Sequence, residues 1–351
     1  MAAERPVAAE IGGVMNDPVN SNFENRGPAM ANMNISMSPK SLGHLVPWAV
    51  AIAFFFLFPE RLGQWTEILI CVLFTISMDL ALGYAGIVTL GHAAFFGIGA
   101  YTAGLMSIHV TGDPIIGMVA ATVLAGIAGL ITGMLILHTT GVTLLMLTLA
   151  IAAMLENWAN RATKITGGDD GLQGMELGNL FGIFEFNFFG VTAFWYALGV
   201  LFIWFLIAYR IVRSPFGRSI DGIRQNANRM RAIGTPVWWR LVVMYGVSAA
   251  MAGSAGALTS YKTEFVGLTV LQLLTSGIVA VMLILGGQKT IYGAFFGAAI
   301  YIMVRDTAAE TYPFLSEAII GIMLILVVLF LEDGVMSVPK ILRRRPKKAA
   351  E

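Results

Sequence analysis

Four ionisable side chains lie within long apolar stretches of the sequence: Glu67, Asp79, His92 and Glu317. An ionisable group costs roughly 3 kcal/mol at the centre of a bilayer, and in membrane proteins it usually faces a cavity or a partner helix. Glu67 and Asp79 could contact a solute or proton, or they could lie near a membrane face or form an interhelical hydrogen bond. These side chains are the first candidates for a transport site.

A glycine-rich segment precedes His92. Gly83, Gly86 and Gly91 come before the apolar run that starts there, and this spacing is typical of an interrupted helix. Such a helix exposes backbone groups that can line a pathway, whereas a structural hydrogen bond is the alternative role for His92. Because an apolar tube offers a charged solute no hydrogen bonds, we predict that polar groups from this region line a central pathway: Asp79, Tyr84, Thr89, His92 and Tyr101.

Two patterns that could indicate ligand sites are excluded. The string LGGQKT at 285–290 lacks the Gly-Lys pair of a phosphate-binding loop, and no strand is expected before it. The four histidines have no spacing typical of metal binding, and the single cysteine, Cys71, cannot form an intrachain disulfide. We therefore expect no ATP site, no metal and no cofactor in this chain.

The elements that carry these residues are predicted to be membrane helices. Hydrophobic residues make up 57% of the 351 residues and charged residues only 12%, against roughly 25% charged in a soluble protein. A bilayer needs about 20 apolar residues per helix. We predict an all-α polytopic membrane protein with about ten transmembrane helices, at 45–58, 65–82, 84–107, 115–137, 141–156, 189–209, 241–260, 268–286, 291–304 and 314–331. The first, fifth and ninth of these blocks are short enough to be tilted, interrupted or partly re-entrant.

Two clusters of cations predict the topology. Seven arginines lie between Arg210 and Arg240, and six lysines or arginines lie between Lys340 and Lys348. Short cation-rich segments stay in the cytoplasm, and four apolar blocks, an even number, separate the two clusters. The loop at 157–188 then faces the periplasm. We predict a disordered cytoplasmic tail at 1–44, a transmembrane domain at 45–335 and a basic cytoplasmic tail at 336–351.

One internal similarity indicates two related halves. AFFG followed by a Tyr four residues later occurs at 94–101 and again at 294–301. Transporters are often built from repeats around a central pathway, although chance is the alternative because these residues are common in membranes. The block count gives parallel repeats, and an inverted pair would require one short block to be miscounted. Small residues four apart in both copies are expected to allow close helix packing.

The loop at 210–240 has the length for two short helices. A break at Pro215-Phe216-Gly217 is followed by the run RSIDGIRQNANRMRAIG. Such helices could dock on another protein. The alternative is an anchor to anionic lipid, but charge alone does not account for the order of break, helix, Gly234 and Pro236.

Five ordered motifs resemble the LivM-type permeases. These are membrane subunits of ABC importers for branched-chain amino acids, in a family that also includes importers of urea, short amides and other small carboxylates. The motifs are GYAGIVTLGHAAFFGIGAYTAGL at 83–105, TGGDDGL at 166–172, SPFGRSIDGIRQNANRMRAIG at 214–234, SAAMAGSAGAL at 248–258 and LGGQKTIYGAFFGAAI at 285–300. The resemblance covers about residues 45–335, and it is specific for the family but weak for the substrate.

In that family the cytoplasmic stretch is the coupling loop, which docks on the ATPase. The resemblance assigns coupling to Arg218, Arg224, Asn226, Arg229, Ala232 and Gly234. The chain departs from its relatives at Gln225, Ala227 and Arg231, where acidic residues are common, and this suggests a particular ATPase partner. It departs again at Glu332 and Asp333, where Pro and Arg are frequent, and nothing in the sequence accounts for that change.

The resemblance implies a non-catalytic permease subunit of an ABC importer in the bacterial inner membrane. The expected solute is an amino acid, branched-chain or other, with urea, short amides or small carboxylates as the alternative. The implied partners are two ABC ATPase subunits, a second LivH-like permease, a periplasmic solute-binding protein and the bilayer, with no nucleic acid. From other classes, an ion-coupled secondary transporter would use Asp79 and Glu67 as coupling sites, and the transport-like motifs argue against a membrane scaffold.

Overall fold

The computed structural model describes residues 42–179 and 190–313 and a few residues between 315 and 325. Within this part the chain is helical, with no strand and one isolated β-bridge between Leu172 and Val266. The longer helices are α1 (Leu42–Leu57), α2 (Leu62–Met78), α3 (His92–His109), α4 (Pro114–Ile136), α5 (Val142–Arg161), α7 (Val191–Arg213), α10 (Val237–Thr263), α11 (Leu273–Gly286) and α12 (Gly293–Thr311). The all-α class is confirmed for these residues.

Several expectations fall outside the described residues. They concern the tail at 1–41, the end of the 157–188 loop, most of the tenth apolar block, Glu317, Glu332, Asp333 and the basic tail at 336–351. The tails, the topology and the count of ten spans therefore stay predictions.

Five helices in the described part are long and apolar enough to cross a bilayer. They are Pro59–Tyr84, which contains α2, and α4, α5, α7 and α10. The other four of the first nine predicted blocks coincide with α1, α3, α11 and α12. The third block starts as a helix only at His92, so the predicted interruption before it is present.

Two of the blocks predicted to be short are longer than expected. The helix α5 runs without a break from Val142 to Arg161, and α12 runs from Gly293 to Thr311. Of the three alternatives for these two blocks, interruption is therefore wrong, and a tilted or partly re-entrant helix stays a prediction. The physical reason is that their last turns are polar, which ends the apolar run but not the helical hydrogen bonding. The segment predicted as a loop from residue 157 begins inside α5.

The core of the compact unit from Ala49 onward is built around α10, which packs against α2, α3, α4 and α7. Small residues allow this close approach. A Cβ placed on Gly99 of α3 would overlap the backbone of Gly253 in α10, so a larger residue at Gly99 would push the two helices apart. The glycine Gly297 of the second AFFG segment likewise lies against the backbone of α11 at Met282. Close packing at Gly297 is confirmed, while the repeat itself stays a prediction.

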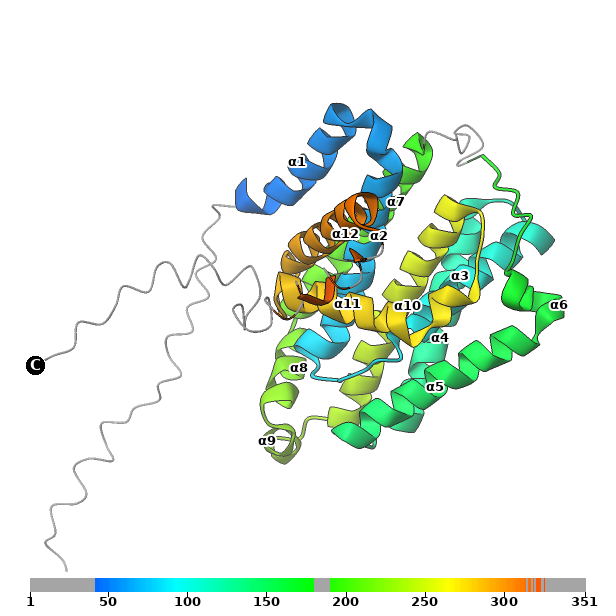
Figure 1. Cartoon of the computed structure of the whole chain (residues 1–351). Helices are drawn as coiled ribbons and strands as arrows, with labels where there is room; N and C mark the ends of the chain where they lie inside the picture. Colours follow the sequence, from blue (N-terminus) through cyan, green and yellow to red (C-terminus); the bar gives the residue numbers. More distant parts are fainter. Residues whose placement is uncertain are drawn as a thin grey trace, which may run out of the picture. The chain divides into compact units, whose positions relative to one another are not determined.

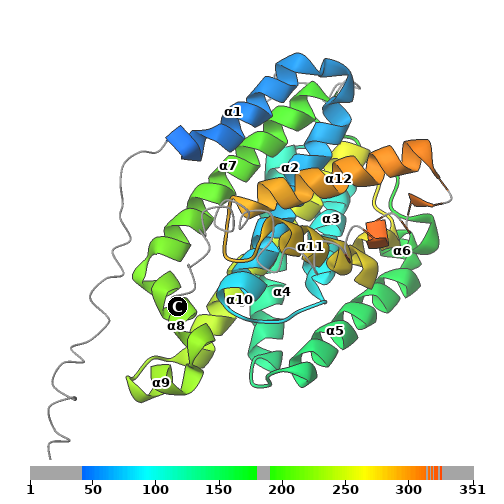
Figure 2. The same ribbon diagram turned by 60° about the vertical axis from the view of Figure 1, so that its left-hand side comes forward.

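The loop between α7 and α10 contains the two predicted short helices, α8 (Pro215–Gln225) and α9 (Ala227–Ala232). Both have side-chain caps at their first turns. Ser214 Oγ accepts from the N–H of Gly217 at 3.2 Å, and Asn226 Oδ1 accepts from the N–H of Arg229 at 2.9 Å. Both views show α8 and α9 together at one end of the unit, next to the start of α10 (Figure 1, Figure 2).

Candidate functional site

The end of α2 changes its helical geometry at Asp79. Residues Asp79–Tyr84 form a π-helical turn, and the chain then leaves the helix through Gly86, whose φ is 72°. A π-turn widens the helix and often marks a functional site. This is the glycine-interrupted segment that the sequence predicted.

The side chain of Asp79 ties this turn to a second glycine-containing loop, between α11 and α12. Asp79 Oδ1 accepts from the backbone N–H of Lys289 at 2.9 Å, and the Tyr84 hydroxyl donates to the Lys289 carbonyl at 3.0 Å. Gly83 leaves room for this arrangement, because a Cβ there would overlap the Asp79 carboxylate. The α11–α12 loop is therefore held directly against the end of α2.

The helix α8 is joined to both of these segments. The Arg224 guanidinium donates to the carbonyl of Gly83. Lys289 Nζ lies 2.5 Å from Asp221 Oδ1, and this hydrogen bond lowers the pKa of the Asp221 carboxyl below its ordinary value. We name Asp79, Gly83, Asp221, Arg224 and Lys289 the coupling junction. It joins α8 to the C-terminal end of α2 and to the loop before α12.

The remaining residues of the predicted coupling set lie on the outer side of α8 and α9. Arg218, Arg229, Ala232 and Gly234 are exposed, while Ile220 and Ile223 of α8 are buried and anchor that helix. Arg224 and Asn226 are also exposed, but Arg224 bonds to Gly83 within the coupling junction and Asn226 caps the first turn of α9. An anchored helix pair with an exposed basic face is suited to docking.

Gly234 lies in the turn that ends α9. Its φ is 83°, its N–H donates to Arg231 O at 2.9 Å, and the N–H of Thr235 donates to Met230 O at 3.0 Å. This pair of bonds satisfies the last carbonyls of a helix through a residue with positive φ.

His92 lies in the interior of the bundle with no exposed surface. Its Nε2 is 3.1 Å from Ser77 Oγ and 3.2 Å from Ser248 Oγ. Both serine hydroxyls already donate to carbonyls, those of Phe74 and Ser77, so Nε2 must carry the proton and donate. The histidine thus joins α2, α3 and α10, as the alternative of a structural hydrogen bond requires.

The five predicted pathway residues are not gathered in one place. Asp79 and Tyr84 belong to the end of α2, at the coupling junction. Thr89 is buried, and its Oγ1 accepts from the N–H of Gly91 at 3.2 Å in the turn before α3. Tyr101 packs in an apolar cluster with Leu172 and Leu271. That these residues line a pathway stays a prediction.

The comparison with known proteins decides the family. Residues 62–328 match the family described as "Branched-chain amino acid transport system / permease component". The chain belongs to this permease family. With its long apolar helices, it is a multi-pass membrane protein and a transport subunit.

Individual relatives of this permease carry the name LivM. The "High-affinity branched-chain amino acid transport system permease protein LivM" of Salmonella typhimurium is 24% identical, over 78% of this chain and 69% of that protein. The Escherichia coli protein of the same name gives the same values. The "Probable branched-chain amino acid transport permease protein LivM" of Methanocaldococcus jannaschii is 22% identical, over 78% of this chain and 92% of its own. No solved structure matches the permease.

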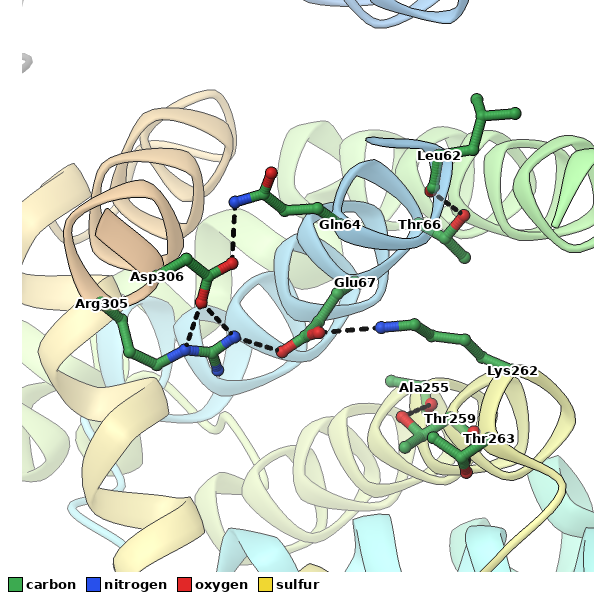
Figure 3. A network of polar contacts seen from close by, with 10 residues as sticks. All are labelled: Leu62, Gln64, Thr66, Glu67, Ala255, Thr259, Lys262, Thr263, Arg305 and Asp306. Atoms are coloured by element: carbon green, nitrogen blue, oxygen red, sulfur yellow. Dashed lines mark hydrogen bonds and ion pairs between the residues drawn. The ribbon is translucent and has the colours of Figure 1, made fainter. Parts of the chain in front are cut away.

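Sequence reasoning missed the partners of the charged residues. Lys289 lies in the string that does not qualify as a phosphate loop, and its position in a family-like motif was the one available signal. Glu67, considered alone from the sequence, forms interhelical ion pairs with Lys262 of α10 and Arg305 of α12 (Figure 3). Among the residues described, no group of His, Cys, Asp and Glu could hold a metal ion.

Proposed function

We propose that this permease is a membrane-spanning subunit of an ATP-driven ABC importer and that its solute is an amino acid, branched-chain amino acids first. Family membership and the printed names of the LivM relatives support this assignment. The observation that carries it is the coupling junction, where Arg224 and Asp221 of α8 hold the end of α2 and the loop before α12. An importer driven by a separate ATPase needs such a connection between its docking surface and its helices.

In the proposed mechanism the exposed face of α8 and α9 docks on an ATPase subunit. ATP closes the two ATPases and displaces α8, and the coupling junction passes this displacement to α2 and α12. The helices then open toward the other side. ATP and the loaded solute-binding protein must each bind the two conformations with different affinity, because a ligand shifts an equilibrium only by that difference.

The proposed assembly has four kinds of subunit, of which the two permeases lie in the bacterial inner membrane. This chain pairs with a second, LivH-like permease, and two ATPases dock on the cytoplasmic side. A periplasmic binding protein delivers the solute from the outside. The seven arginines of loop 210–240 support a cytoplasmic location for α8 and α9.

The test is uptake by proteoliposomes that contain the complete transporter and the binding protein. We expect accumulation of radiolabelled leucine that requires internal ATP and persists when ionophores collapse ion gradients. Uptake that needs an ion gradient and no ATP would instead identify a secondary transporter. Uptake of urea or acetamide, with none of leucine, isoleucine or valine, would keep the ABC class and refute the amino acid assignment.

A further inference from the structure

A second group of charges lies away from the coupling junction, at the far end of α10. Glu67 Oε2 accepts from Lys262 Nζ at 2.8 Å, and Glu67 Oε1 accepts from Arg305 at 2.8 Å. Arg305 also pairs with Asp306 at 2.8 Å. We name Glu67, Lys262, Arg305 and Asp306 the ionic cluster. Figure 3 shows Glu67 on α2 between Arg305 on α12 and Lys262 on α10.

The ionic cluster and the coupling junction lie near opposite ends of the same helices. α10 begins beside α9 and reaches Lys262 near the end of its 27 residues, a length of about 40 Å at 1.5 Å per residue. α2 runs the opposite way, from Glu67 to the π-turn at Asp79. With α8 in the cytoplasm, as the arginines of loop 210–240 indicate, the ionic cluster lies toward the outside.

The charged side chains of this cluster are partly exposed at the surface of the chain. The exposed fractions of the four charged side chains range from 21% for Lys262 to 36% for Arg305. Each charge is costly to keep in a membrane helix, and apolar residues of similar size commonly replace an ion pair without loss of stability. Holding three helices together is therefore a weak reason for this chain to carry four charges here.

The order of the charges suits one class of ligand. Along the cluster they read Asp306, Arg305, Glu67, Lys262, which is negative, positive, negative, positive. A zwitterion can insert between Glu67 and Lys262, with its ammonium on Glu67 and its carboxylate on Lys262, and every charge remains paired. An amine alone would leave Lys262 without a counter-charge, and a carboxylate alone would leave one negative charge in excess in the otherwise neutral cluster.

We infer that the ionic cluster is a binding site for the zwitterionic head of the transported solute on the outer side of the permease. Glu67 receives the ammonium group, and Lys262 receives the carboxylate. Binding breaks the Glu67–Lys262 ion pair and thereby releases α10 from α2 at the outer end. This inference rests on the proposed function, since it takes the solute to be an amino acid.

The test removes both charges together. The double variant Glu67→Gln with Lys262→Met leaves the Arg305–Asp306 pair intact, so it contains no uncompensated charge. In proteoliposomes with saturating, leucine-loaded binding protein we expect leucine uptake to fall at least tenfold, with an unfolding temperature close to that of the unmodified transporter. The matched control is Thr259→Val on the same end of α10, which loses only a hydroxyl bonded to its own helix at Ala255 O and should keep its uptake within twofold.

A labelling experiment tests the ligand class and does not depend on the double variant being stable. A cysteine introduced as Thr259→Cys, one turn before Lys262 on α10, is labelled with N-ethylmaleimide in the complex without binding protein and with the native cysteine replaced. Leucine should slow the labelling at least threefold, whereas isovalerate and isopentylamine, which carry only one of its two charges, should not. Protection by none of the three compounds, or equal protection by all, would refute a zwitterion site.

The two proposals fail in different ways. If the unmodified transporter takes up no amino acid with ATP, the proposed function is wrong. If the unmodified transporter takes up leucine and the double variant does so at the same rate, only the ionic cluster's role in binding is refuted, and the cluster is a brace between helices.

Discussion

The substitution Gly234→Val tests whether the shape of the α8–α9 loop transmits ATP closure. Gly234 has a φ of 83°, a region that costs an L-residue about 1–2 kcal/mol and is less accessible still to a β-branched one. A Cβ at this position would meet nothing within 4 Å. The variant therefore suffers backbone strain without a steric clash, and the turn before Pro236 is the part that must change. At 1.4 kcal/mol per tenfold, the native turn becomes roughly tenfold less populated relative to its alternatives.

The assay compares ATP-dependent uptake, ATP hydrolysis and assembly with the ATPases in the same proteoliposomes. We expect Gly234→Val to lower uptake and solute-stimulated ATP hydrolysis together by about tenfold, while the amount of protein in the membrane stays near normal because the apolar helices are unchanged. Gly234→Asn is the matched control, since Asn tolerates positive φ, and it should retain most of the uptake. A Gly234→Val transporter that assembles with the ATPases and works at the unmodified rate would mean that the loop is a lipid anchor.

Four further predictions concern the junction, the pathway and the topology. Asp221→Asn and Lys289→Met should each lower uptake, because each substitution removes the same exposed ion pair, which is worth about 0.2–1 kcal/mol. The double variant should therefore be no worse than either single variant. Additive losses of uptake would show that the two residues act separately. Because the folded-state pKa of Asp221 is lowered, its ion pair stabilises the protein above about pH 4, and this stabilisation is lost as the pH falls through the lowered pKa. The difference in unfolding temperature between the unmodified protein and Asp221→Asn should therefore shrink on acidification. A constant difference would argue against the ion pair. In a chain without the native cysteine, Tyr84→Cys should react with water-soluble thiol reagents and His92→Cys should not until the transporter turns over, and a segment unlabelled in every state would be packing only. A reporter fused after residue 348 should be active in its cytoplasmic form, and periplasmic activity would reverse the orientation.

Local sequence was sufficient for the helices and for the coupling loop. Runs of apolar residues predicted nine helices that the structure contains, because a helix satisfies its own backbone in an apolar medium. The length of the loop and its break at Pro215-Phe216-Gly217 predicted the two short helices, α8 and α9. The side-chain caps that begin them, Ser214 and Asn226, were recognised only in the structure. Where the helix ends were misjudged, as at Arg161 of α5, the polarity of the last turn concealed a continuing helix.

The pairing of charges depended on the tertiary structure. Asp221 and Lys289 are 68 positions apart, and Glu67 and Arg305 are 238 positions apart, so neither pair leaves a periodic trace in the sequence. Sequence alone could say that a charge in an apolar helix needs a partner, but the identity of that partner follows from which helices lie side by side. For the same reason the contacts of LGGQKT could not be predicted from the sequence. The backbone N–H of Lys289 in this string bonds to Asp79 at the end of α2, and its ammonium pairs with Asp221 of α8. His92, a pathway candidate by its glycine-rich context, is held by two serines from two other helices, because only the packing of α2, α3 and α10 brings those hydroxyls to its ring.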